Sequence, residues 1–263
     1  SDLLGFIQDP DPGAFGPLAD RVVSHQIATI PAYARLCHAR GWDGSWRDAP
    51  LVPTELFREV DLCGAEPGLA EATFCTSGTT GQGQRGRRRV PNLGLYHAAM
   101  EGPFVAQVLR GERTPRPWLC LLPSIEVQPE SSLGHMVHQL AERLADQERS
   151  RWCVSADGVD VSSAWEHLEE RTSRGEPVVL LTTSFALIQF LDAAPTRRVG
   201  LAEGSVMMLT GGLKGRSRTV DEATLLKEIT ARLGLSAHDV IPEYGLTELT
   251  SQAYGRPLVA PPW

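Results

Sequence analysis

A hydroxyl- and glycine-rich turn at residues 73–86 carries the residue types in this chain that are best suited to chemistry. It reads Thr-Phe-Cys-Thr-Ser-Gly-Thr-Thr-Gly-Gln-Gly-Gln-Arg-Gly, and its hydroxyl and glycine residues come directly after an apolar segment. Its hydroxyl side chains can donate hydrogen bonds to an anion, and they belong to Thr76, Ser77, Thr79 and Thr80. Its glycines permit positive φ angles that turn backbone N–H groups toward the same anion, and they are Gly78, Gly81 and Gly83. The composition predicts a phosphate-binding loop.

The turn alone leaves other interpretations open. A Walker-type ATP loop needs a lysine followed by Ser or Thr, and the residues after Gly78 are Thr-Thr-Gly-Gln-Gly-Gln, which disfavours that mode. Short Ser/Thr/Gly segments also occur as linkers and ordinary surface loops. A second signal is therefore needed.

Two further motifs supply that signal. Residues 243–248 read Glu-Tyr-Gly-Leu-Thr-Glu and follow a short apolar run at 240–242, which predicts a strand. Between this motif and the loop, residues 209–216 read Leu-Thr-Gly-Gly-Leu-Lys-Gly-Arg. The order of the three motifs along the chain is more specific than any one of them.

Together the motifs resemble the adenylate-forming (ANL) superfamily, whose loop is usually Thr-Ser-Gly-Thr-Thr-Gly-x-Pro-Lys-Gly and whose later motif is Tyr-Gly-x-Thr-Glu. Four stretches are similar to the acyl-protein synthetase (LuxE-like) branch, which is related to phenylacetate-CoA ligases. They are residues 51–57, 122–133 followed by Met136, 210–216 and 244–252.

This resemblance implies a role for each matching residue. The loop residues would grip the β- and γ-phosphates of ATP: Thr76, Ser77, Gly78, Thr79, Thr80 and Gly81. Thr247 and Glu248 would be the catalytic residues, with Thr247 bound to the α-phosphate and Glu248 to Mg²⁺. Tyr244 would flank adenine, and Gly211 and Gly212 would let the backbone approach the base. Structural alternatives stay open: Tyr244 as a core aromatic, Glu248 as a solvated residue at a helix start, and the glycines as a plain turn.

The implied reaction is ATP-dependent activation of a carboxylic acid to an acyl-adenylate with release of pyrophosphate. The acyl group would then pass to a thiol on a protein cysteine, a carrier-protein phosphopantetheine or coenzyme A. A fatty acid is the default for the branch, and an aryl or amino acid is equally compatible with the motifs. The alternative is a non-catalytic nucleotide- or partner-binding module that retains the fold.

The loop departs from the family pattern at two positions. Gln84 stands where the family has lysine, and Gly83 stands where it has proline. An arginine cluster follows directly, and it comprises Arg85, Arg87, Arg88 and Arg89. Arg85 or Arg87 can compensate for the missing lysine, because a guanidinium suits phosphate, or the cluster is a solvated basic face.

We expect residues 1–263 to form an N-terminal adenylation core, with possible subdomains at 1–115 and 116–256. No segment matches the acidic ribose-binding motif, the hinge or the lysine-bearing C-terminal domain of the family. We therefore expect that domain to be absent and the isolated chain to turn over poorly.

Composition narrows the class of protein. The chain is 42% hydrophobic, which allows a large core, and no run approaches the ~18 apolar residues of a membrane span. A net charge of −7 argues against nucleic acid or an anionic membrane as a partner. Five dispersed cysteines and no visible secretory signal favour a cytoplasmic protein.

Apolar periodicity predicts alternating helices and strands, hence a layered α/β core. A helix is expected over 15–39 with a break at Pro31. Further helices are expected at 132–147, 162–174, 184–191 and 221–233, and strands at 118–122, 152–155, 177–183 and 206–209.

Overall fold

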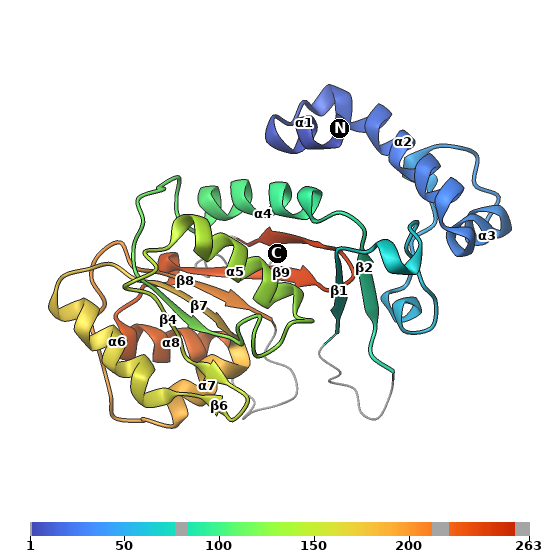
Figure 1. Cartoon of the computed structure of the whole chain (residues 1–263). Coiled ribbons are helices and arrows are strands. Elements are labelled where there is room, and N and C mark those ends of the chain that lie inside the picture. The colour runs from blue at the N-terminus through green and yellow to red at the C-terminus, as the bar shows by residue number, and fades with distance from the viewer. Residues whose placement is uncertain (1, 77–83, 212–220, 256–263) are drawn as a thin grey trace. The chain divides into compact units, whose positions relative to one another are not determined.

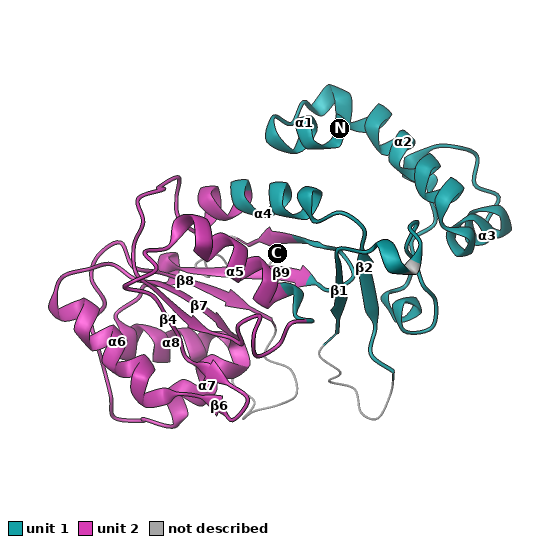
Figure 2. Cartoon of the chain, viewed as in Figure 1, with its two compact units in different colours: residues 1–102, 130–132, 246–251 teal, residues 103–129, 133–245, 252–263 magenta. Residues whose placement is uncertain are grey.

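The chain divides into two compact units in the computed structural model, which describes residues 2–76, 84–211 and 221–255. Unit 1 comprises residues 1–102, 130–132 and 246–251. Unit 2 comprises residues 103–129, 133–245 and 252–263 (Figure 2). The chain therefore returns to unit 1 twice after leaving it, each time for a short segment.

Unit 1 begins with three helices: α1 (Asp2–Gln8), α2 (Pro12–Thr29) and α3 (Pro31–Ala39). The Asp11 side chain caps α2 by accepting a hydrogen bond from the Gly13 N–H at 2.9 Å, and Pro12 occupies the first turn. Ile30 has an extended backbone, and Pro31 begins the next helix. The predicted break at Pro31 is confirmed, because proline lacks the N–H that a continuous helix would need.

The remainder of unit 1 holds the hairpin that carries the hydroxyl-rich turn. Short 3₁₀ turns at Trp46–Asp48, Thr54–Arg58 and Pro67–Leu69 lead to β1 (Ala72–Cys75), which pairs antiparallel with β2 (Arg87–Val90). Helix α4 (Leu93–Gln107) follows and continues into unit 2. The buried ring of Phe74 on β1 packs against Tyr96 on α4, with 5.9 Å between ring centroids.

Unit 2 is built on a sheet with strand order β10-β9-β8-β7-β3-β4 (Figure 1). The pairs from β9 through to β4 are parallel. The strands are β3 (Trp118–Leu121), β4 (Arg151–Trp152), β7 (Val179–Thr183), β8 (Val206–Thr210), β9 (Val240–Leu246) and β10 (Ser251–Tyr254). The helices are α5 (Ser132–Leu144), α6 (Val161–Ser173), α7 (Ser184–Asp192) and α8 (Glu222–Leu233), with a 3₁₀ turn at Ala237–Asp239.

Helices cover both faces of this sheet. One buried cluster joins Leu180 and Met207 of the strands to side chains of α6, α7 and α8, and within it the rings of Trp165 and Phe190 stack at 4.6 Å. The buried side chains of α5 lie outside that cluster, on the opposite face (Figure 1). Every residue of β3 is buried, as expected for a parallel strand covered on both faces. The predicted layered α/β fold is confirmed.

One predicted strand is wrong as a single element. Residues 152–155 divide between β4, which pairs with β3, and β5 (Val154–Ser155), which pairs antiparallel with β6 (Gly158–Val159). The Cys153 N–H donates a hydrogen bond to Cys120 O on β3, and the Cys153 carbonyl accepts one from the Asp160 N–H. The chain changes partners at this residue, and apolar periodicity carries no signal for such a change.

Helix α6 begins one residue before the predicted position. Its cap is Asp160, whose carboxylate accepts hydrogen bonds from the Ser163 N–H at 3.1 Å and from its hydroxyl at 2.7 Å. Within the described ranges, no helix combines the length and the apolar character that crossing a bilayer would require.

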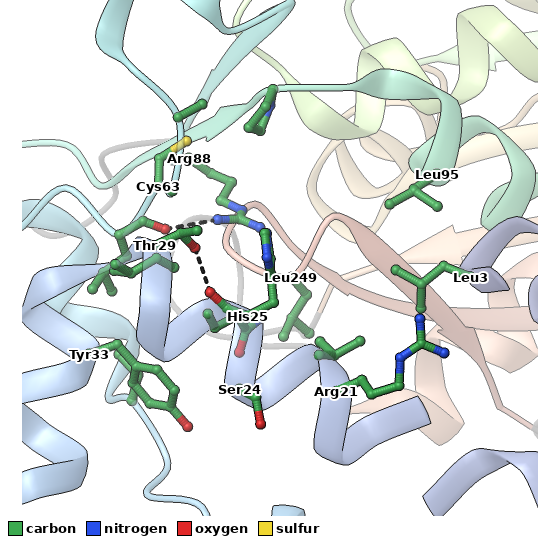
Figure 3. Close-up of a pocket in the computed structure, with 18 of the residues that line it drawn as sticks. Leu3, Arg21, Ser24, His25, Thr29, Tyr33, Cys63, Arg88, Leu95 and Leu249 are labelled. Atoms are coloured by element: carbon green, nitrogen blue, oxygen red, sulfur yellow. Dashed lines mark hydrogen bonds between the residues drawn. The ribbon is translucent and has the colours of Figure 1, made fainter. Parts of the chain in front are cut away.

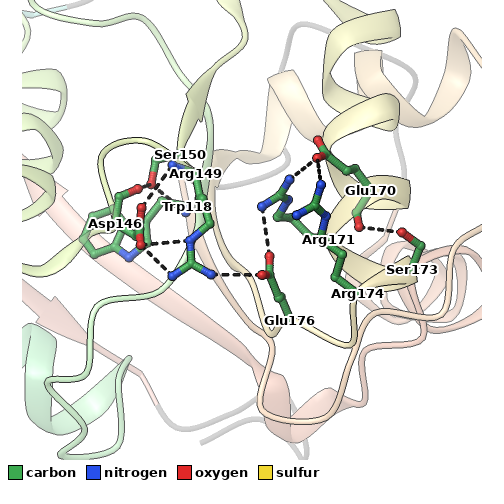
Figure 4. Close-up of polar contacts among 9 residues, drawn as sticks. All are labelled: Trp118, Asp146, Arg149, Ser150, Glu170, Arg171, Ser173, Arg174 and Glu176. Carbon is green, nitrogen blue, oxygen red and sulfur yellow. Dashed lines mark hydrogen bonds and ion pairs between the residues drawn. The ribbon is translucent and has the colours of Figure 1, made fainter.

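A polar network fixes the amino ends of β3 and β7 (Figure 4). The Ser150 hydroxyl accepts a hydrogen bond from the N–H of Trp118, the first residue of β3, at 2.9 Å. Glu176 lies shortly before β7 and forms ion pairs with Arg149 and with the buried Arg171, each with 2.9 Å between a guanidinium nitrogen and a carboxylate oxygen. Arg149 also pairs with Asp146, and Arg171 also pairs with Glu170, so Glu176 links two guanidinium groups that come from different parts of the chain.

We predict that Glu176→Gln lowers the free energy of unfolding by about 2 kcal/mol, because the buried Arg171 would keep only the more exposed of its two carboxylate partners, Glu170. Urea unfolding followed by tryptophan fluorescence measures this change. Glu166→Gln, on the exposed face of α6, is the matched control and should change stability by less than about 0.5 kcal/mol. Equal losses in the two variants would contradict a structural role for the network.

Candidate functional site

Several of the residues singled out in the sequence lie outside the described part of the chain. They are Ser77, Gly78, Thr79, Thr80 and Gly81 of the loop, with Gly83, and Gly212 of the glycine turn. The remaining site residues fall in both units. Thr76, Thr247 and Glu248 belong to unit 1, and Gly211 and Tyr244 belong to unit 2.

The two ends of the loop are fastened together beyond the last residue pair of the hairpin. The Thr76 N–H donates to Gly86 O at 2.9 Å, and the Gly86 N–H donates to the Thr76 hydroxyl at 3.0 Å. Because this hydroxyl acts as an acceptor for Gly86, its own proton remains for donation. Thr76 and Gly86 are therefore held together, and we call this pair of residues the loop base.

Glu248 meets the loop at this base. A Cβ atom added to Gly86 would lie 3.1 Å from Thr76 Cγ2 and 3.3 Å from Glu248 Oε1, closer than side-chain atoms normally approach. Glycine at this position thus leaves room for the carboxylate. Thr76 and Gly86, the described ends of the loop, therefore lie beside Glu248 of the later Thr-Glu motif, which is far away in the sequence.

Thr247 is joined to the same place through Ser132. The Ser132 hydroxyl donates to the Thr247 hydroxyl at 3.5 Å, and the Tyr96 hydroxyl donates to Ser132 O at 3.0 Å. Residues 247–250 form a turn in which the Leu249 N–H donates to Leu246 O at 3.1 Å. Glu248 is therefore in a tight turn, and its interpretation as a helix-start residue is wrong.

The arginines after the loop mostly hold unit 1 together. Arg85 donates from Nε to Thr76 O at 2.6 Å and forms an ion pair with Glu130 at 2.7 Å. Arg88 donates to Leu62 O at 3.2 Å, and its burial lowers the pKa of the guanidinium.

Arg89 forms an ion pair with Asp61 and donates to Glu66 O at 3.0 Å. A solvated basic face does not describe these three side chains, whereas Arg87 is exposed. Arg85 fixes the start of the loop through its hydrogen bond to Thr76 O.

A cavity of about 1140 Å³ lies within unit 1 (Figure 3). Its lining is largely apolar and comes from α1, α2 and the segment before β1, with Arg88 and His25 among the polar side chains. Glu248 and Leu249 also line it. The carboxylate that faces the loop base therefore borders a space large enough for a small molecule.

In unit 2, the described site residues lie at the carboxyl ends of β8 and β9. Gly211 directly follows β8 with φ 84°, and its carbonyl accepts a hydrogen bond from the Ser184 hydroxyl at 2.7 Å. Tyr244 on β9 is 61% exposed, so its interpretation as a core aromatic is wrong. In open parallel sheets, ligands bind outside these strand ends.

One polar residue at this edge of the sheet, Glu243, is not among the site residues that the motifs predict. Glu243 is 6% exposed, and its register partner on β8 is Thr210. Burial raises the pKa of the Glu243 carboxyl from 4.5 to about 7, and the nearby Thr210 hydroxyl only partly opposes this shift. Within the described part of the chain, neither Glu243 Oε2 nor Thr210 Oγ1 has a hydrogen-bond partner. The sequence signal for it is a carboxylate placed directly after the apolar run at 240–242.

Comparison with known proteins supports the fold and leaves the reaction open. No family model matches the sequence, and no curated protein matches it. Among solved structures, a 2-hydroxyisobutyryl-CoA ligase in complex with 2-HIB-AMP and CoA superposes with a TM-score of 0.61 at 15% identity. The match covers 94% of this chain and 52% of the ligase, so the chain spans about half of that protein.

Two further structures are weaker matches. The N-terminal domain of FACL13 from Mycobacterium tuberculosis gives a TM-score of 0.42 at 14% identity, over 73% of this chain and 42% of that one. The o-succinylbenzoate CoA synthetase from Bacillus subtilis gives 0.44 at 18% identity, over 72% and 32%. These scores are too low to carry an argument. The likeness to the ligase establishes that the chain has the fold of about half of such an enzyme.

The raised pKa of Glu243 makes stability depend on pH. Below pH 4.5 the carboxyl is protonated in the folded and unfolded states alike, and from 4.5 to about 7 only the unfolded state loses its proton. Stability should therefore fall across this window, by about 3 kcal/mol in total at ~1.4 kcal/mol per pH unit. We predict that Glu243→Gln becomes progressively more stable than the parent chain from pH 4.5 to about 7. Urea unfolding across this range tests it, and a constant difference would contradict it.

Proposed function

We propose that this chain is the adenylation core of an enzyme that activates a carboxylic acid with ATP. A carboxylate oxygen would attack the α-phosphorus, the bond from that phosphorus to the bridging oxygen would break, and pyrophosphate would leave. The acyl-adenylate would then react with a thiol and release AMP. The resemblance to acyl-protein synthetases favours a fatty acid as substrate and a protein cysteine, carrier phosphopantetheine or coenzyme A as acceptor.

The observation that carries this proposal is the meeting of two motifs at Gly86. Thr76 and the Glu248 carboxylate both lie against the position of a Cβ at this glycine, at 3.1 and 3.3 Å. Glycine-rich backbone together with hydroxyl donors suits phosphate oxygens, and a carboxylate suits the cation that accompanies them. The juxtaposition supplies both parts within unit 1.

The residues present fit Mg²⁺ and a nucleotide. Thr76 and Thr247 offer hydroxyl protons to phosphate oxygens, and Glu248 offers one carboxylate to Mg²⁺, which usually takes few protein ligands and completes its shell with phosphate and water. Bound Mg²⁺ would neutralise charge on the phosphate oxygens. Exposed Tyr244 and the open backbone at Gly211 are the groups proposed to contact the base.

The thiol acceptor is proposed to be a separate group. The chain has five cysteines with free thiols, and Cys37, Cys75, Cys120 and Cys153 are buried. Burial raises the pKa of the Cys153 thiol to about 11, and it also raises the pKa of Cys75. Thiols with raised pKa values are poor nucleophiles near neutral pH, because the thiolate is the reactive form.

Calorimetric titration of the chain with Mg²⁺·ATP tests the proposal. We predict saturable binding that weakens at least tenfold, about 1.4 kcal/mol, in Glu248→Ala. Tyr244→Ala should also weaken it. The control is Glu55→Ala, an exposed carboxylate of unit 1, which makes the same change in net charge. Unchanged affinity in Glu248→Ala would count against the proposed site, and absence of binding by the folded parent would favour a partner-binding module.

Gly86→Ala tests the geometry of the loop base. The added methyl group would displace Thr76 or Glu248, and Gly86 has no positive φ that alanine would strain. We therefore expect severalfold weaker Mg²⁺·ATP binding with the melting temperature nearly unchanged. Gly68→Ala is the control, because a Cβ there has no described neighbour within 4 Å. Equal nucleotide affinity in both variants would refute the proposed role of Gly86.

A further inference from the structure

A row of polar side chains crosses the carboxyl ends of three parallel strands in unit 2. Thr183 on β7 is the register partner of Thr210 on β8, and Thr210 is the register partner of Glu243 on β9. Side chains of register partners on neighbouring strands project from the same face of a sheet, so all three lie on one face.

The preceding row on this face is apolar throughout. It consists of Leu181, Met208 and Ile241, which are aligned by the same register and are all buried. The face therefore changes from apolar to polar at the edge of the sheet where ligands of parallel sheets bind.

The polar row is only partly satisfied. The Thr183 hydroxyl accepts a hydrogen bond from the Ala186 N–H at 3.2 Å and caps α7. Among the residues that the structure describes, Thr210 Oγ1 and Glu243 Oε2 are buried and have no hydrogen-bond partner, and the same holds for the amide of Gln252 on β10, the strand next to β9. Folded proteins leave few such atoms unpaired, and unpaired atoms on three residues of adjoining strands require an explanation.

A structural role does not account for Glu243. A core position would be more stable with an apolar side chain, since a buried carboxyl with an unpaired oxygen is penalised by the loss of its hydration. No basic side chain forms an ion pair with it in the described part of the chain. Tyr244, the next residue, points to the opposite face, so the place proposed for the base does not compete for Glu243.

We propose that Glu243 and Thr210 together recognise a hydrogen-bond donor on the ligand, and that the acid activated by this chain bears a hydroxyl or amino group. The second half of this statement rests on the proposed function. It replaces an unsubstituted fatty acid by a polar-substituted carboxylic acid as the substrate class. A site built to bond a donor discriminates strongly against the analogue that lacks it, because its buried polar groups are then left unpaired.

The test is calorimetric titration of the whole chain with carboxylic acids in matched sets. One set is hexanoate, 6-hydroxyhexanoate and 6-aminohexanoate, another is hexanoate with its 2- and 3-hydroxy derivatives, and a third is benzoate with its 4-hydroxy and 4-amino derivatives. Each set is measured with and without Mg²⁺ and α,β-methylene-ATP, an analogue that cannot be cleaved at the α-phosphorus. The hydroxyl and amino members separate a neutral donor from an ammonium group.

We expect at least one donor-bearing acid to bind about tenfold or more tightly than its unsubstituted partner. Glu243→Leu should abolish this preference, and the nearly isosteric Thr210→Val should reduce it severalfold. If Glu243→Leu fails to fold, Thr210→Val carries the comparison.

Three outcomes would overturn the inference: equal or tighter binding of every unsubstituted acid, a preference that survives both substitutions, or no binding of any acid by a chain that binds the nucleotide analogue. Donor preference without nucleotide binding would remove the proposed function and leave this recognition site standing.

Discussion

The close approach of Thr76 and Glu248 to Gly86 is the constraint on which the proposed site depends. Any side chain at position 86 would enter the space that the Glu248 carboxylate occupies. The backbone bonds between Thr76 and Gly86, and the Arg85 guanidinium on Thr76 O, hold the loop ends in the geometry that makes this approach possible. The composition of the loop is suited to phosphate, and this packing places a carboxylate beside its described end at Gly86.

The parallel sheet of unit 2 carries the second proposed site, at the carboxyl ends of its strands. Its interior rows are apolar and covered by helices, while the polar network around Glu176 fixes the amino ends of β3 and β7. At the carboxyl ends, the row through Thr210 and Glu243 departs from the rule that buried polar groups are paired. A sheet stabilised at its opposite end can carry such a departure, and local conflicts of this kind are expected where function is located.

Much of the fold could be predicted because its signals are local. Pro31 separates two helices, Asp221 and Gly234 bound α8, and unbroken apolar runs correspond to β7 and β8. The split at Cys153 and the burial of Glu243 could not be predicted, since both depend on which strands become neighbours. For the proposed site, the order of the motifs indicated Thr76, Thr247 and Glu248 as candidates, but only the three-dimensional contacts reveal that Arg85 bonds to Thr76 at the start of the loop and that Gly86 makes room for Glu248.

The central claim is that a nucleotide phosphate and its metal bind where the loop base meets Glu248. A crystal structure of the chain with Mg²⁺ and α,β-methylene-ATP tests it most directly. The account predicts Mg²⁺ bound to a Glu248 carboxylate oxygen at about 2.1 Å, with phosphate oxygens within hydrogen-bonding distance of the Thr76 and Thr247 hydroxyls. An analogue bound with its phosphates away from these three side chains, or Mg²⁺ without Glu248 among its ligands, would contradict it.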